Sequence, residues 1–214
     1  MLPGVVFIFL LLIQVSFLQP ELEHVRTTFP DPAAIGLAVN RVLSTVFFAG
    51  VALIYLLRKP PARVRHSPSA VVVSMYASFI LFALRPLANV LGVTPADVGP
   101  AQLLVSDALV LLGIGFAVYA LGYLKLSFSI MPEARALVTG GPYRVVRHPL
   151  YLGEITAGLG LVLALPSWFS VVVFVTLVAA QLVRTRYEED VLRDSFPEYT
   201  EYARQTKRLL PWLI

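Results

Sequence analysis

Cysteine is absent from the 214-residue chain. Its absence excludes disulfides, a thiolate nucleophile and cysteine-ligated zinc, and it does not indicate a compartment. Without it, packing and polar contacts between helices must hold a helical bundle together. The sequence also lacks a cluster of Lys and Arg interleaved with exposed aromatic residues, so it predicts no nucleic-acid partner. No metal site is predicted either.

Charged residues are scarce as well. They make up 14% of the chain, whereas 57% is hydrophobic, and the mean hydropathy is +0.77. A typical soluble domain is about 25% charged and about 45–50% apolar. This composition cannot cover a soluble surface, so we expect a lipid bilayer to surround most of the chain. The length favours one compact membrane domain.

Long apolar runs are what the sequence does contain. The first four lie at Leu2–Leu18, Ala33–Leu57, Ser69–Leu91 and Leu103–Leu124. Each is close to the roughly 20 residues with which a helix crosses a bilayer. The first run has no cationic n-region and no small-residue cleavage site before Gln19-Pro20, so we interpret it as a retained helix rather than a signal peptide. Arg85-Pro86 interrupts the third.

The last apolar block, Ile155–Val183, carries no charge and is too long for one ordinary span. Pro166-Ser167-Trp168 lies near its middle, and proline breaks a helix by removing a donor and clashing with the previous turn. We therefore predict a helical hairpin over 150–183. Each of its arms has about 16 residues and reaches roughly 24 Å, which keeps its polar ends near the interface.

The charges between the runs predict the orientation. The loops 58–68 and 125–149 are basic, with Arg58, Lys59, Arg63 and Arg65 in the first and Lys125, Arg135, Arg144 and Arg147 in the second. The loop 19–32 holds Glu21, Glu23 and Asp31 against Arg26. Because basic loops face the cytoplasm, both termini are predicted to be cytoplasmic. The predicted fold is an all-α integral membrane protein with about six transmembrane helices, including the C-terminal hairpin, and a cytoplasmic C-terminal helical segment.

Two polar segments, Thr139–Glu154 and Arg184–Pro211, flank this hairpin. Its antiparallel arms should bring them together at one face of the membrane, so that Arg147-His148 meets Arg184 and the Glu188-Glu189 pair. Ionisable groups at this depth are costly and are therefore functional candidates. For isolated cations such as Arg144 and Arg186, the sequence favours snorkelling to the interface instead.

The motifs "GGPYRVVRHPLYLGE" (140–154) and "RTRYEEDVLRDSFPEYTEYARQTKRLLPWL" (184–213) resemble the isoprenylcysteine carboxyl methyltransferases and their bacterial relatives. That family has a G-P-Y-x-x-x-R-H-P-x-Y-x-G loop, a helical hairpin, R-x-x-x-E-E-x-x-L, an aromatic series and a terminal proline. The resemblance covers roughly the last 80 residues, and the first four helices match only as hydrophobic spans. "FPEYTEY" shortens one spacing of the aromatic series.

The resemblance implies a membrane methyltransferase that uses S-adenosyl-L-methionine from the cytosol and a lipophilic small-molecule or prenylated substrate from the bilayer. It implies an N-terminal region of four spans (1–124) and a cofactor-binding catalytic region (125–214). The cofactor-binding candidates are His148, Tyr151, Gly141, Pro142, Tyr143, Arg147 and Glu189. The candidates beside the transferred methyl group are Arg184 and Glu188.

The chemistry of these residues is compatible with that activity. The Gly140-Gly141 pair can expose backbone N–H groups to a carboxylate by adopting positive φ. Arg184 and Glu188 are spaced i,i+4 on one helical face, where the arginine can grip a substrate carboxylate in bidentate fashion. A carboxylate acceptor is already anionic and requires no general base, so catalysis would reduce to alignment and exclusion of water. Without the resemblance, a plain surface ion pair explains the same spacing.

Other interpretations stay open. NADPH-dependent sterol reductases share an R-H-P-x-Y-x-G-E segment, although Leu150 replaces their usual asparagine, and a non-catalytic transporter or scaffold is a third possibility. The acceptor can be a prenylcysteine, an isoprenoid acid or a phospholipid amine. Arg85, Asn89 and Asp107 can form an inter-helix link or line a substrate entrance. The aromatic face of Phe196, Tyr199 and Tyr202 favours packing on the hairpin.

Overall fold

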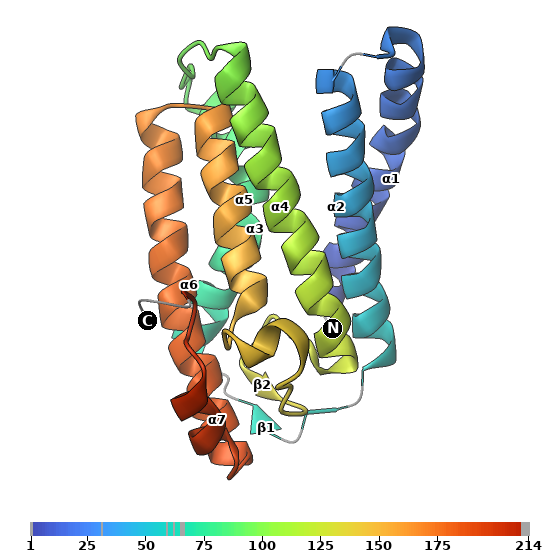
Figure 1. Ribbon diagram of the computed structural model, residues 1–214. Helices are drawn as coiled ribbons and strands as arrows, with labels where there is room; N and C mark the ends of the chain where they lie inside the picture. Colours follow the sequence, from blue (N-terminus) through green and yellow to red (C-terminus); the bar gives the residue numbers. More distant parts are fainter. Residues whose placement is uncertain (1, 31, 59, 62, 65–66, 211–214) are drawn as a thin grey trace.

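The computed structural model describes residues 2–30, 32–58, 60, 61, 63, 64 and 67–210. Its long helices run up and down one bundle (Figure 1). They are α1 (Leu2–Thr28), α2 (Pro32–Leu57), α3 (Pro68–Val90), α4 (Pro100–Leu124), α5 (Pro149–Ala164) and α6 (Trp168–Ser195), followed by the short α7 (Tyr199–Gln205). Within the described residues, five helices are long and apolar enough to cross a membrane, and α5 is a shorter apolar helix. The predicted all-α membrane fold is confirmed.

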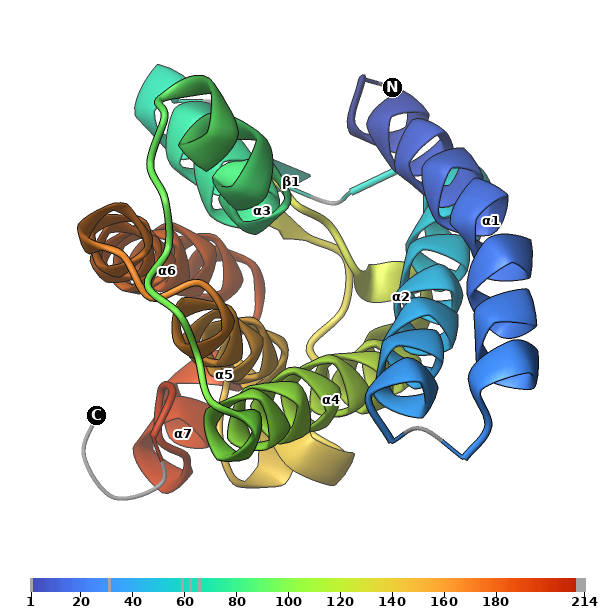
Figure 2. The ribbon, with the colours of Figure 1, turned by 90° about the horizontal axis from the view of Figure 1, so that it is seen from above.

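The helices follow one another around the bundle in the order α1, α2, α4, α5, α6, α3 (Figure 2). The closest approach is between α4 and α5. A Cβ added at Gly113 would lie 2.4 Å from the backbone nitrogen of Ala157, and one at Gly153 would lie 2.6 Å from the carbonyl oxygen of Gly113. Small residues let membrane helices pack backbone to backbone, and this contact fixes the first turns of α5, where the site lies.

Proline interrupts neither α1 nor α3. Helix α1 continues through Pro20 to Thr28, and α3 continues through Arg85-Pro86, so the predicted loop 19–32 and the predicted interruption of α3 are wrong. Lipid offers no alternative hydrogen-bond partners, so a membrane helix tolerates proline where other contacts hold it. In α1 such a contact is Glu21, which binds Arg41 of α2.

The predicted hairpin is present, but its arms are unequal. The turn lies at Leu165–Ser167, and Ser167 caps α6 by accepting a hydrogen bond from the Ser170 backbone. Helix α5 has the expected 16 residues, whereas α6 has 28. The arm does not end near Val183 because the following residues are mostly good helix formers. Arg184 and Glu188 therefore lie inside a helix.

Short elements shape the end of the bundle where α7 lies. Strand β1 (Arg63–Val64) pairs antiparallel with β2 (Glu133–Ala134), and the 3-10 helices η1 (Lys125–Ser127) and η2 (Gly141–Arg144) follow α4 and precede α5. The pairing brings the two basic loops to one end, which is also where α1 begins (Figure 1). Which side of the membrane this end faces stays a prediction. The charges at Asp31, Lys59 and Arg65 and the terminal Pro211-Trp212 lie outside the described residues.

Candidate functional site

Glu189 organises the first cluster of the site. Its side chain is 3% exposed, and its carboxylate accepts hydrogen bonds from Arg147 Nε (2.9 Å) and Arg208 Nη2 (2.9 Å), with His148 Nε2 3.3 Å away. Charge-assisted bonds of this kind are the stronger hydrogen bonds of proteins. They join the segment before α5, the end of α6 and the segment after α7.

The backbone reinforces this junction. Arg147 and His148 donate their N–H groups to the carbonyl oxygens of Lys207 (2.7 Å) and Arg208 (3.1 Å). The His148 ring stacks on Tyr151 with the ring centroids 5.4 Å apart and 6° between the planes. The predicted meeting of the Arg147-His148 corner with the end of α6 is present in the structure, and the C-terminal segment holds it from the other side.

Glu188 organises the second cluster. Its Oε1 accepts hydrogen bonds from the Tyr151 hydroxyl and from Arg184 Nε (3.2 Å). The Arg184 guanidinium lies over the Tyr151 ring, 4.4 Å from its centroid, and donates to Ser78 Oγ (3.1 Å) and the Ile130 carbonyl oxygen (2.9 Å). Arg184 is 1% exposed, so the interpretation of Arg184–Glu188 as a plain surface ion pair is wrong.

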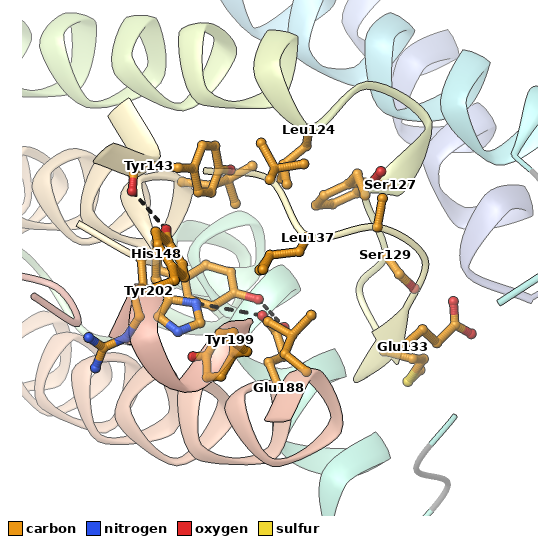
Figure 3. Close-up of a pocket in the computed structure, with 18 residues that line it drawn as sticks. Leu124, Ser127, Ser129, Glu133, Leu137, Tyr143, His148, Glu188, Tyr199 and Tyr202 are labelled. Atoms are coloured by element: carbon orange, nitrogen blue, oxygen red, sulfur yellow. Dashed lines mark hydrogen bonds and ion pairs between the residues drawn. The ribbon is translucent and has the colours of Figure 1, made fainter. Parts of the chain in front are cut away.

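A cleft of about 90 Å³ opens beside these clusters (Figure 3). We call it the polar cleft because charged and phenol side chains line it, although apolar side chains such as Phe128 and Leu192 do so as well. The sequence-predicted residues on its wall are Tyr143, Arg147, His148, Tyr151 and Glu188. Arg184 and Glu189 lie behind that wall, in contact with its residues, whereas Gly141 and Pro142 do not line the cleft. Tyr199 and Tyr202 also line the cleft, so the aromatic face of α7 does more than pack on the hairpin. The prediction from the sequence missed this role, and the polar phenol group of each tyrosine is the one signal that could have indicated it.

Three tyrosines line the cleft near α7 and η2, and the hydroxyls of two of them have no described hydrogen-bond partner. The Tyr202 hydroxyl donates to the Tyr143 carbonyl oxygen (2.7 Å), but the buried hydroxyls of Tyr143 and Tyr199 have no hydrogen-bond partner among the described residues. Burial raises the pKa of the Tyr143 and Tyr199 phenols above their usual value and that of Tyr202 to about 12. All three stay protonated at neutral pH. A buried hydroxyl without a partner is unfavourable, so the cleft fits a polar ligand.

Gly141 adopts φ +58°, as predicted for one member of the glycine pair, whereas Gly140 has φ −90°. A Cβ at Gly141 would lie 2.4 Å from the Tyr123 ring of α4. Glycine is therefore required for the loop to turn against α4, and the next two residues of η2, Pro142 and Tyr143, are buried.

An apolar cavity of about 470 Å³ lies on the other side of the wall, inside the ring of helices. Arg184 and Glu154 line it, and Phe128 borders both this cavity and the cleft. Glu154 accepts a hydrogen bond from Gln181 Nε2 (2.5 Å). Arg184 thus faces the apolar cavity, while its partner Glu188 faces the polar cleft.

The sequence allowed Arg85 of α3 and Asp107 of α4 to form a link between helices, but no described ion pair joins them. Arg85 lines the apolar cavity instead, which is the position that the alternative prediction, a substrate entrance, requires. Among all the residues that the structure describes, no group of three or more His, Asp or Glu side chains could hold a metal ion.

The fold and site define a multi-pass helical membrane protein in which a polar cleft and an apolar cavity share one wall. The family model described as phospholipid methyltransferase matches residues 101–199. This range includes α4, which the sequence resemblance had left outside, and it confirms the resemblance for the region that carries the cleft.

The chain is also similar to individual proteins with two kinds of name, metal resistance and methyl transfer. The chain is 35% identical over 113 residues to the cobalt-zinc-cadmium resistance protein CzcN of Cupriavidus metallidurans (51% of this chain, 52% of that protein). It is 32% identical over 113 residues to the nickel-cobalt-cadmium resistance protein NccN of Alcaligenes xylosoxydans (51% and 53%). It is 40% identical over 84 residues to a probable protein-S-isoprenylcysteine O-methyltransferase of Oryza sativa subsp. indica (38% and 44%). The chain spans about half the length of the curated relatives it matches.

Proposed function

We propose that this protein is a membrane methyltransferase that transfers a methyl group from S-adenosyl-L-methionine to a nucleophile on a lipophilic substrate. The observation that carries the proposal is the shared wall of Tyr151, Arg184 and Glu188, which separates a polar cleft from an apolar cavity. A polar donor and a lipophilic acceptor can approach such a wall from opposite sides. The phospholipid methyltransferase model and the rice relative support this reading.

The residues of the cleft suit this cofactor. When bound, S-adenosyl-L-methionine supplies an electrophilic methyl group on a sulfonium centre. The Glu188 carboxylate is a group that stabilises a cation, and the hydroxyls of Tyr143 and Tyr199, which have no described partner, suit polar groups of the cofactor. His148 lines the cleft next to Tyr151, on which its ring stacks.

The cleft must widen to take the whole cofactor. Ligand pockets usually measure about 300–1,000 Å³, whereas this one measures about 90 Å³. The segment 136–140 follows β2, belongs to no helix or strand, and lines one side of the cleft through Ala136, Leu137 and Val138. We infer that it moves outward when the cofactor binds, because the opposite side is fixed by the buried contacts of Glu189.

Arg184 is placed to orient the acceptor. Its guanidinium is held by Ser78, Ile130 and Glu188, so its direction is set before the substrate arrives. An arginine fork binds a carboxylate in bidentate geometry, and a carboxylate needs no general base. The favoured acceptor is therefore a carboxylate on a lipophilic molecule, which includes a prenylcysteine and an isoprenoid acid.

An amine acceptor would require a different residue. A protonated amine must lose a proton before it attacks a methyl group, and Glu154 is the carboxyl group that lines the cavity near Arg184. The family description names phospholipids, so a phospholipid amine is the second candidate, with Glu154 as proton acceptor. Substitution of Glu154 by Gln separates the two, because it abolishes transfer to an amine and spares transfer to a carboxylate.

We further propose that residues 125–214 form the catalytic region, with the cleft and both termini on the cytoplasmic side.

The test of the methyltransferase function begins with calorimetric titration of the detergent-solubilised protein with S-adenosyl-L-methionine and, separately, with NADPH. Saturable binding of the methyl donor is expected. Binding of NADPH alone would assign the site to a reductase, and binding of neither would favour a non-catalytic protein. Radiolabelled methyl transfer to a total lipid extract then identifies the acceptor fraction.

A further inference from the structure

A second polar group faces the apolar cavity, far from the catalytic wall. Arg41 of α2 donates to Glu21 Oε1 through Nε (3.0 Å) and Nη2 (2.5 Å), and to Gln14 Oε1 through Nη1 (2.5 Å). These three residues and Arg85 of α3 line the cavity. Charged side chains within membrane-spanning helices are costly and mark functional sites by default, and the proposed methyl transfer uses none of these four.

The depth of this group follows from one aromatic contact. The rings of Phe48 (α2) and Phe82 (α3) lie 5.1 Å apart, centroid to centroid, and both line the cavity. Arg41 is seven residues beyond Phe48, or about 10 Å along the helix axis, and Arg85 is three residues beyond Phe82, or about 5 Å, in the same direction. Ser78, which binds Arg184, lies four residues on the opposite side of Phe82.

The cavity is therefore polar at both ends and apolar between them. We call the part lined by Gln14, Glu21, Arg41 and Arg85 the distal end. Glu21 neutralises Arg41 there, and the two side chains are each 25% exposed. Arg85 has no hydrogen bond or ion pair with any described residue. The charge that remains at the distal end is one positive charge, which favours an anionic ligand group.

We propose that the distal end binds an anionic terminal group of an amphiphile whose other end reaches Arg184. The acceptor would then be polar at both ends, with a hydrocarbon chain passing the Phe48–Phe82 contact. Calling this amphiphile the substrate rests on the proposed function, whereas the binding site itself does not. A simple snorkelling arginine would bind lipid phosphate outside the bundle and would show no preference for a ligand of the cavity.

The experiment uses the full chain in nanodiscs of a zwitterionic phospholipid, without methyl donor. Calorimetry compares decanedioic acid, whose extended chain is close to the roughly 10 Å between Ser78 and Arg85 along α3, with its monomethyl ester, which has the same chain but one neutral end. The wild type should bind the diacid about tenfold more tightly, as expected for one added charged contact. Arg85→Gln should reduce this ratio to near one, and Arg85→Lys should largely retain it. Comparing variants cancels any difference in how the probes partition into lipid.

Arg26→Gln is the matched control, because Arg26 is an 82% exposed cation at the far end of α1 and does not line the cavity. It should keep the wild-type ratio. A ratio near one in the wild type, or an equal loss in Arg26→Gln and Arg85→Gln, would overturn the distal site. The diacid preference without methyl-donor binding in the separate titration would overturn the proposed function alone.

Discussion

Arg184 and Tyr151 donate hydrogen bonds to the same oxygen, Oε1 of Glu188, while the guanidinium of the arginine lies over the ring of the tyrosine. One carboxylate thus holds together a residue of the apolar cavity and a residue of the polar cleft. This arrangement makes Arg184 the residue whose replacement should separate cofactor binding from catalysis.

Arg184→Lys should reduce methyl transfer at least about 100-fold, the order of loss expected from misplacing a positioning group. Lysine cannot reproduce the simultaneous contacts with Ser78, Ile130 and Glu188. Calorimetric binding of S-adenosyl-L-methionine should change little, because Arg184 lies behind the cleft wall. Arg186→Lys, at an exposed position two residues along, is the control. Equal loss of donor binding and turnover would contradict this division of roles.

His148→Ala and Tyr151→Ala should behave in the opposite way and weaken donor binding. Both rings line the cleft and stack on each other, so removing either opens the wall on which the donor rests. We expect at least about a tenfold rise in the dissociation constant from lost stacking and hydrogen bonding. Tyr76→Phe, which alters a phenol bound to Thr176 away from the cleft, should leave binding unchanged.

Tyr199→Phe tests the unpartnered hydroxyl. Because this hydroxyl has no described partner, its removal should leave thermal stability unchanged or slightly higher. Binding of S-adenosyl-L-methionine should weaken several-fold if the cofactor supplies the missing partner. A loss of stability with unchanged binding would show that the hydroxyl serves the fold instead.

Glu189→Gln should destabilise the protein by about 3–5 kcal/mol, since breaking a buried ion pair leaves uncompensated charges. Arg147 and Arg208 both depend on this carboxylate. The measurement is denaturant-induced unfolding in detergent. Glu201→Gln, in an exposed pair of α7, should cost less than about 1 kcal/mol. Comparable losses in the two variants would argue against Glu189 as the organising residue.

Gly113→Ala should destabilise the packing of α4 on α5 by about 1–3 kcal/mol through overpacking. Gly115→Ala, in the same helix, meets nothing within 4 Å and should be neutral or slightly stabilising. Thermal unfolding of the two variants in one detergent provides the comparison. A neutral Gly113→Ala would mean that the helices separate at little cost.

Local signals predicted the features that depend on neighbouring residues. The break at Pro166-Ser167, the positive φ at Gly141 and the meeting of His148 with the end of α6 all follow from turn chemistry or from the connectivity of a hairpin. The length of α6 was underestimated because hydropathy reports where lipid ends, whereas a helix continues as long as its residues favour it.

The missed features depend on segments that are distant in the sequence. Ser78 reaches Arg184 from α3, and Arg208 reaches Glu189 from beyond α7. Neither contact has a periodic or spacing signal, because each depends on how α6 packs against another part of the chain. The continuation of α1 past Pro20 also depends on a distant segment, because Glu21 in this part of α1 binds Arg41 of α2.

The hydrogen bond between Ser78 and Arg184 makes helix α3 part of the proposed catalytic geometry. Membrane helices respond to hydrophobic mismatch by tilting, and a tilt of α3 would shift the hydroxyl that steadies this guanidinium. Turnover should therefore depend on acyl-chain length in the surrounding leaflets, even with saturating donor and acceptor.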